Sequence, residues 1–322
     1  MHRSFEIVGI VSRPPAPAGR GKKLTKSPVQ LYGERAAIPV LTPERASEEG
    51  FLTALSNWSP DLCITASYGN YLPQRFLSIP RFGTLNIHPS LLPRWRGAAP
   101  VQRSLESGDT TTGVSVLFTV KKMDAGPIVR QSRMELGGDE QFPEVLSALM
   151  ARGAADLLDS LPSVWAGTVQ QWEQDEDAVI EAPKFKNTDS YINFETMSAR
   201  EIHNRSRALC GTFGTWSSFL IVDSSNSNDG GKTESMRINI ISTVVLKDAP
   251  AGAPPPPLDT RVGSSRHPDG RTKGSILSVS CGDGSVLGIT AVQPATKRVM
   301  AARDFLNGMK KNKSLRWGGA GN

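Results

Sequence analysis

Two polar side chains that could take part in chemistry, Asn86 and His88, lie two residues apart in the stretch 83–100. Residues 84–88 alternate between polar and apolar side chains, which predicts a strand, and Pro89 ends it because proline cannot donate to a ladder. Asn86 and His88 would then emerge on one face at the carboxyl end of a strand, where open α/β sheets bind ligands. An Asn amide can donate to a developing oxyanion, and a His can move a proton near neutral pH. An Asn-x-His pair by itself is more often structural than functional.

Asp124 is the candidate third member of this group. It follows a strand-like run at 112–120 and precedes Gly126. A carboxylate at that point could orient His88 and raise its basicity. The composition fits equally well an Asp that serves only as a turn residue before glycine.

The block 86–100 resembles the folate-dependent formyltransferases. Its part at 90–100 (SLLPRWRGAAP) is most similar to the branch of that family that acts on initiator tRNA, and the resemblance extends from about Phe5 to about Arg316. It implies transfer of a formyl group from 10-formyltetrahydrofolate to the amino group of methionine esterified to initiator tRNA, with no metal. The resemblance assigns catalytic roles to Asn86, His88 and Asp124. It assigns folate contacts to Ser90, Leu91, Leu92 and Pro93.

A basic stretch at 13–28 is rich in Pro and Gly, and no acidic residue occurs between Ile7 and Gly33. Proline and glycine exclude a helix there, so its cations are expected on an exposed loop. Such a loop is often merely solvated. This one resembles the family's loop that enters the tRNA acceptor stem, which implies phosphate contacts for Arg20, Lys22 and Lys23.

The composition narrows the class of protein. With 322 residues the chain is long enough for two domains, and a net charge of +6 favours an anionic partner. The three cysteines are far apart in the sequence and form no CxxC pair, so neither zinc nor a disulfide framework is expected. No apolar run approaches the roughly 18 residues of a membrane span. Residues 1–4 are expected to lead directly into a strand, so no leader is expected. We expect a monomer in an organelle matrix, with the mitochondrion preferred and a bacterial-type cytoplasm as the other choice.

Alternating strands and helices predict an α/β fold with a doubly wound, mostly parallel sheet, followed by a small OB-like barrel. The expected domains are a catalytic domain at 1–169, an acidic linker at 170–188 and a tRNA-binding domain at 189–317. Two polar insertions, at 223–235 and 248–273, are expected to be disordered loops. The predicted strands and helices are at 5–11, 28–37, 48–57, 61–67, 101–107, 112–120, 142–160, 217–222, 236–246, 275–280 and 286–292.

The resemblance also predicts that a piece is missing. The family begins with a further strand and helix ahead of the strand that matches 5–11, so about thirty residues appear to be absent. The missing strand would be central, between the strands at 5–11 and 61–67, and its absence would expose apolar strand edges. We therefore expect the chain by itself to fold poorly and to be weakly active.

Two alternative functions remain open from the sequence. One is formyl transfer to a small amine, such as glycinamide ribonucleotide or an amino-sugar nucleotide. The other is a non-catalytic RNA-binding relative that keeps the fold.

Overall fold

The computed structural model describes residues 5–18, 21, 23–223, 232–248, 263–266, 275–309 and 313–319. The chain forms two compact units, each assembled from three stretches. Unit 1 comprises residues 1–98, 113–134 and 148–182. Unit 2 comprises residues 99–112, 135–147 and 183–322. Within the described residues, no helix is both long and apolar enough to span a bilayer.

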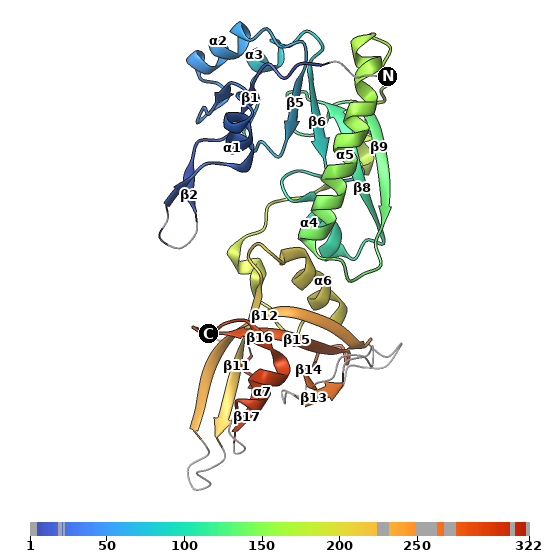
Figure 1. Ribbon diagram of the computed structural model, residues 1–322. Helices are drawn as coiled ribbons and strands as arrows, with labels where there is room; N and C mark the ends of the chain where they lie inside the picture. The colour runs from blue at the N-terminus through green and yellow to red at the C-terminus, as the bar shows by residue number, and fades with distance from the viewer. Residues whose placement is uncertain are drawn as a thin grey trace. The chain divides into compact units, whose positions relative to one another are not determined.

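Unit 1 is built on a four-stranded sheet and a set of short elements (Figure 1). Its elements are β1 (Ile10–Val11), β2 (Ala16–Ala18), β3 (Lys23–Thr25), α1 (Pro28–Arg35), β4 (Val40–Leu41), α2 (Glu49–Asn57), β5 (Cys63–Ala66), α3 (Gln74–Leu77), β6 (Thr84–His88), β7 (Arg94–Arg96), η1 (Glu176–Ala178) and β10 (Ile180–Glu181). Three further elements have residues in both units: β8 (Thr111–Phe118), β9 (Ile128–Glu135) and α5 (Phe142–Trp165).

The four-stranded sheet has the order β5-β6-β8-β9 and is mixed. Strand β5 runs parallel to β6, whereas β8 runs antiparallel to it, so the predicted parallel arrangement does not extend to β8. Helix α5 approaches β6 and β8 at Gly153, where an added Cβ would collide with Ile87 and Val114. Strand β6 spans 84–88 as predicted, and it is fixed by a neighbour on each side and by α5. Its carboxyl end is therefore a rigid platform for Asn86 and His88.

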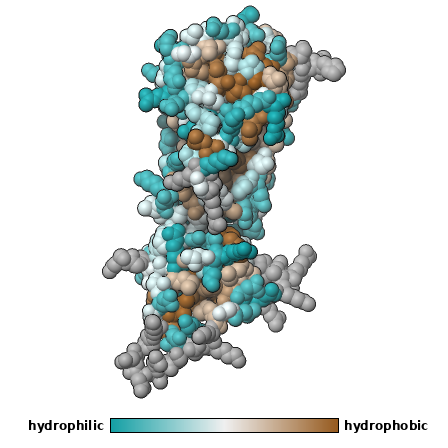
Figure 2. Space-filling model, turned by 60° about the vertical axis from the view of Figure 1, so that its left-hand side comes forward, coloured by the Kyte–Doolittle hydropathy of each residue, from teal (hydrophilic) through white to brown (hydrophobic). Residues whose placement is uncertain are grey.

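Strands β1 and β5 have no ladder between them among the described residues. Strand β1 pairs in parallel with β4, and β5 pairs with β6. The prediction of a buried strand at 5–11 is wrong for its first half, because Phe5, Ile7 and Val8 are exposed. Ile64 on β5 is exposed as well, and Figure 2 shows apolar side chains at the surface of unit 1. Apolar side chains beside exposed strand edges favour aggregation unless another segment covers them.

Unit 2 contains an antiparallel sheet of seven strands that forms a nearly closed barrel, as the sequence predicts. The sheet has the order β13-β14-β15-β12-β11-β17, and β16 pairs with β15. The elements are α4 (Pro100–Ser107), η2 (Asn187–Ser190), α6 (Ala199–Leu209), β11 (Thr215–Asp223), β12 (Lys232–Lys247), β13 (Gly263–Arg266), β14 (Ser275–Ser280), β15 (Val286–Pro294), β16 (Met300–Ala301), α7 (Ala302–Asn307) and β17 (Lys313–Trp317).

The two polar insertions contain more regular structure than the sequence predicts. Residues 232–235 extend β12, and residues 263–266 form β13, which pairs with β14. Both segments were expected to lie in disordered loops. The rest of the two insertions, at 224–231, 249–262 and 267–274, lies outside the described residues.

The core of the barrel is mostly aliphatic and includes three buried aromatic rings. Phe194 is fully buried, and its ring centroid lies 6.0 Å from those of Phe219 and Trp317, in edge-to-face geometry. Helix α6 begins with a capping box: Ser198 Oγ accepts from the Glu201 amide at 3.1 Å, and the Glu201 carboxylate accepts from the Ser198 amide at 2.7 Å. Two backbone donors at the start of the helix are thus satisfied, which fixes where the helix begins.

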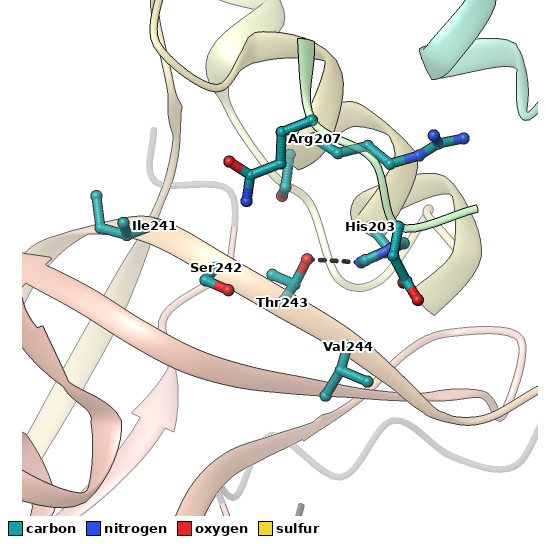
Figure 3. Close-up of a pocket in the computed structure, with 9 residues that line it drawn as sticks. His203, Arg207, Ile241, Ser242, Thr243 and Val244 are labelled. Carbon is teal, nitrogen blue, oxygen red and sulfur yellow. Dashed lines mark hydrogen bonds and ion pairs between the residues drawn. The ribbon is translucent and has the colours of Figure 1, made fainter. Parts of the chain in front are cut away.

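His203 on α6 lines a cavity of about 220 Å³ in unit 2 (Figure 3). Its Nδ1 lies 2.9 Å from Thr243 Oγ1, and its Nε2 lies 3.1 Å from Asp139 Oδ1. Because a carboxylate can only accept, Nε2 carries the hydrogen, and Nδ1 accepts from the hydroxyl. Burial lowers the pKa of His203; the repulsive charge of Arg207 acts in the same direction, and Asp139 opposes both. The side chain is therefore a neutral packing residue.

A pH dependence of stability follows from this burial. Below the ordinary pKa of 6.5 the unfolded chain binds a proton at His203 that the folded chain resists, so stability falls as the pH falls through that value. We expect the thermal midpoint to drop more between pH 7.5 and 5.5 in the natural chain than in the His203→Gln variant. An Asp139→Asn change should steepen the loss, because it removes the charge that favours protonation. Equal drops in all three proteins would contradict this assignment.

Candidate active site

His88 ends strand β6 and is 4% exposed. Its Nε2 lies 3.0 Å from the carbonyl oxygen of Trp95, and its Nδ1 lies 3.7 Å from Asp124 Oδ2. Since a carbonyl can only accept, Nε2 carries a hydrogen and donates it to Trp95. Nδ1, on the side of the carboxylate, is therefore the nitrogen left to take up or release a proton.

The two residues that contact this imidazole both have left-handed backbone conformations. Trp95 has φ +61° and Asp124 has φ +50°. Asp tolerates this region, whereas for a bulky residue such as Trp it is an outlier. Backbone strain of this kind costs on the order of 1–3 kcal/mol per residue, and it persists only where the surroundings enforce it. Such residues cluster at functional sites, so the strain on both sides of His88 supports a chemical role.

Asp124 lies in the turn between β8 and β9, and its side chain is 16% exposed. The backbone amide of Gly97 donates to Asp124 Oδ2 at 3.2 Å. Gly97 has φ +130°, and an added Cβ there would lie 2.9 Å from the Ala182 carbonyl oxygen, so glycine is required. The carboxylate is thus held between an amide and the imidazole. At 3.7 Å it acts on His88 through its charge and would stabilise an imidazolium that forms during a reaction.

Asn86 is half-buried on the same face of β6 as His88. Its Oδ1 accepts a hydrogen bond from Thr65 Oγ1 at 2.8 Å, across the β5–β6 pair. This contact fixes the orientation of the amide and leaves the Nδ2 hydrogens to donate elsewhere. Thr65 was not identified from the sequence, because its partner is 21 residues away on another strand. The register of β5 against β6 would have been needed to find it.

Asn86, His88 and Asp124 form an arrangement suited to transfer of a carbonyl carbon. An amide and an imidazolium can donate to the oxyanion of a tetrahedral intermediate, while the imidazole and the carboxylate can take up the proton that the nucleophile loses. The structure brings the three residues predicted from the sequence into one unit and places two of them in direct contact range.

Residues 90–93, predicted to contact a ligand, differ in where their side chains lie. Ser90 is fully buried and donates to the Arg94 carbonyl at 2.7 Å, and Leu92 packs in the core. Leu91 and Pro93 are half-buried. A ligand at this segment would therefore contact Leu91, Pro93 or the backbone rather than the other two side chains.

The basic stretch at 13–28 is not a loop throughout. Strands β2 and β3 pair as an antiparallel hairpin, which the sequence did not predict. Lys23 begins β3 and is exposed, whereas Arg20 and Lys22 lie outside the described residues. Lys26 pairs with Glu34 at 2.8 Å, and this contact lowers the pKa of the Glu34 carboxyl.

The segment 170–182, expected to be a linker, belongs to unit 1. The backbones of Trp172 and Ile128 exchange two hydrogen bonds, at 2.8 and 3.0 Å, and β10 pairs in parallel with β7. Glu176 in this segment forms ion pairs with Lys122 and Arg96, and the contact with Lys122 is the main reason that the pKa of Glu176 is lowered.

Family models and known proteins match nearly the whole chain. Residues 2–155 match the family described as formyl transferase, and residues 184–310 match its C-terminal domain. The methionyl-tRNA formyltransferase of Myxococcus xanthus (strain DK1622) is 32% identical over 95% of this chain and 88% of its own length. The enzyme of the same name from Lactiplantibacillus plantarum is 30% identical over 94% and 88%.

A solved structure shares the fold along the chain. WlaRD, a sugar 3N-formyl transferase whose structure was determined in the presence of dTDP and 5-N-formyl-THF, has a TM-score of 0.55 with 12% identity, over 91% of this chain and 100% of its own. At that identity the likeness shows the fold alone.

Proposed function

We propose that this chain, which belongs to the formyl transferase family, transfers the formyl group of 10-formyltetrahydrofolate to the amino group of methionyl initiator tRNA. The observation that carries the proposal is the His88–Asp124 pair, 3.7 Å apart at the end of β6, with Asn86 two residues before His88 on the same strand. The curated relatives from Myxococcus and Lactiplantibacillus, similar over most of their length, favour tRNA as the acceptor.

In the proposed reaction the methionyl amine attacks the formyl carbon and a tetrahedral oxyanion forms. Asn86 Nδ2 and a protonated His88 would donate to that oxyanion, each worth roughly 3–4 kcal/mol by analogy with oxyanion holes. Collapse breaks the bond from the formyl carbon to N10 of the folate. Asp124 takes up the proton lost by the amine, through water, while His88 releases its Nδ1 proton to N10 and then regains one from Asp124. The products are formylmethionyl-tRNA and tetrahydrofolate, so atoms and charge balance.

The remaining assignments complete the proposal. Ser90, Leu91, Leu92 and Pro93 would form the folate side of the site, and Leu91 and Pro93 are the half-buried side chains among them. Residues 1–169 would supply catalysis with the support of 170–182, which belong to unit 1, and 189–317 would form a tRNA-binding barrel. We propose that the chain acts as a monomer without a metal. We propose a mitochondrial matrix as its compartment, which fractionation of its source cells would test.

The test of this function is a comparison of acceptors at one concentration of 10-formyltetrahydrofolate. We expect formyl transfer to methionyl initiator tRNA and none to glycinamide ribonucleotide or to an amino-sugar nucleotide. Transfer to a small amine but not to tRNA would replace this proposal with a small-molecule formyltransferase. RNA binding with no transfer to any acceptor would indicate a non-catalytic relative.

The basic stretch at 13–28 leads to a prediction about tRNA binding. Changing Arg20, Lys22 and Lys23 to Ala should weaken the affinity for tRNA and flatten its salt dependence, because each phosphate contact contributes about 0.7–0.9 to the slope of log K against log salt. Lys26→Ala is the matched control, since the Lys26 charge is already paired with Glu34. The affinity is measured by filter binding between about 50 and 200 mM salt. If the slope of log K against log salt is unchanged in the triple variant, the basic stretch at 13–28 does not contact the tRNA.

A further inference from the structure

We propose that Gln174 is a positioning residue that holds the Asp124 turn in the conformation needed beside His88. The inference rests on the proposed function of Asp124 and adds to it a residue outside the site as defined above.

The Gln174 side chain clamps the turn through two hydrogen bonds. It is buried, and its Nε2 donates to the carbonyl oxygen of Asp124 at 2.7 Å and to that of Gly126 at 2.8 Å. Both amide hydrogens are therefore used on one turn, on either side of Ala125. Gln174 lies 50 residues from Asp124 in the sequence, in the acidic segment expected to be a linker.

Arg96 fixes which way the Gln174 amide faces. Its Nη2 donates to Gln174 Oε1 at 2.8 Å, so the oxygen must face Arg96 and the nitrogen must face the turn. Arg96 is itself 3% exposed, and its charge is paired with Glu176 at 3.2 Å. The orientation of the clamp is thus set by a buried cation that follows Trp95, the residue whose carbonyl holds His88.

The turn needs these hydrogen bonds because its backbone conformation is strained. Asp124 has φ +50°, and a Cβ at Gly126 would collide with the Phe118 carbonyl. Without the two hydrogen bonds the Asp124 backbone can relax toward an ordinary conformation, which would carry the carboxylate away from His88 Nδ1. Displacements of about 1 Å in a catalytic group can lower a rate about a hundredfold.

The test uses Gln174→Glu, which keeps the size of the side chain and its contact with Arg96 but cannot donate to the two carbonyls. We expect kcat for formylation to fall about ten- to a hundredfold with KM for tRNA unchanged. Gln171→Glu is the matched control, since Gln171 is exposed and lies three residues earlier in the same segment. It should leave kcat as it is.

A double-mutant cycle separates positioning from a general structural role. In an Asp124→Ala background, Gln174→Glu should cause no further loss, because the group it positions is gone. An equal loss in both backgrounds, or no loss in the single variant, would overturn the inference.

A spectroscopic readout keeps the test independent of turnover. The ring ¹⁵N signals of His88, assigned with a His88→Gln variant, should shift in Gln174→Glu toward their positions in Asp124→Ala and stay fixed in Gln171→Glu. Unmoved signals in Gln174→Glu would overturn the inference even if the chain formylates tRNA. Shifted signals in a chain that formylates nothing would uphold it while the proposed function fails.

Discussion

Replacing His88 with Ala is expected to lower kcat about a hundredfold or more while leaving the affinity for tRNA nearly unchanged. The imidazole is buried at the end of a rigid strand, with Nε2 committed to the Trp95 carbonyl and Nδ1 facing Asp124. It therefore has a single nitrogen available for proton transfer, and general acid–base catalysis contributes about 10²–10⁴. Steady-state formylation and tRNA binding, measured on the same preparation, give both quantities.

Loss of a buried side chain could also destabilise unit 1, so the His88 result needs a control for folding. His88→Gln retains an amide that can donate to Trp95, and it should melt near the natural protein while it remains as slow as His88→Ala. If either variant keeps near-normal turnover, His88 is not the proton-transfer residue and the assignment is wrong.

The second large effect is expected at Asn86. Asn86→Ala removes the Nδ2 donor, and loss of one oxyanion donor costs about 10²–10³ in kcat. The loss should fall on kcat rather than on KM for either substrate, because the oxyanion exists only in the transition state and intermediate. Asn86→Asp should be at least as slow, since it puts a negative charge where the oxyanion develops.

Thr65→Val provides the matched control for Asn86. It removes the hydrogen bond that orients the amide but leaves the amide in place. A neutral hydrogen bond contributes about 1 kcal/mol, so we expect a loss of about tenfold or less. If Thr65→Val and Asn86→Ala are equally impaired, the effect comes from distortion of the β5–β6 pair and not from a lost oxyanion donor.

The sequence predicts best where the local pattern decides the structure. Strand β6 spans Thr84–His88 as expected, because alternating side chains define it and Pro89 ends it. The strands predicted at 275–280 and 286–292 follow from equally local signals, and the structure has them at 275–280 and 286–294. The strand predicted at 5–11 is longer than the observed strand β1, which spans Ile10–Val11. The apolar residues at its start suggest burial, but they are exposed in the structure.

The hydrogen bonds that hold the site residues in place could not be predicted, because they join segments that are distant in the sequence. Thr65 donates to Asn86 from the neighbouring strand, and Gln174 donates to the carbonyl of Asp124, which is 50 residues away in the sequence. The acidic composition of 170–181 indicated a solvated linker, yet Gln174 in it is buried. The left-handed backbone at Trp95 also has no sequence signal, since a bulky residue rarely adopts that conformation.

The most direct test of the central claim is single-turnover transfer of a ¹³C-labelled formyl group from 10-formyltetrahydrofolate to methionyl initiator tRNA. The product is identified by mass spectrometry of the amino acid released from the tRNA. We predict labelled formylmethionine with the natural chain and at least about a hundredfold slower formation with His88→Ala prepared in the same way. Labelled product that forms equally fast with His88→Ala, or no product with a natural chain that melts cooperatively and binds the tRNA, would contradict the account.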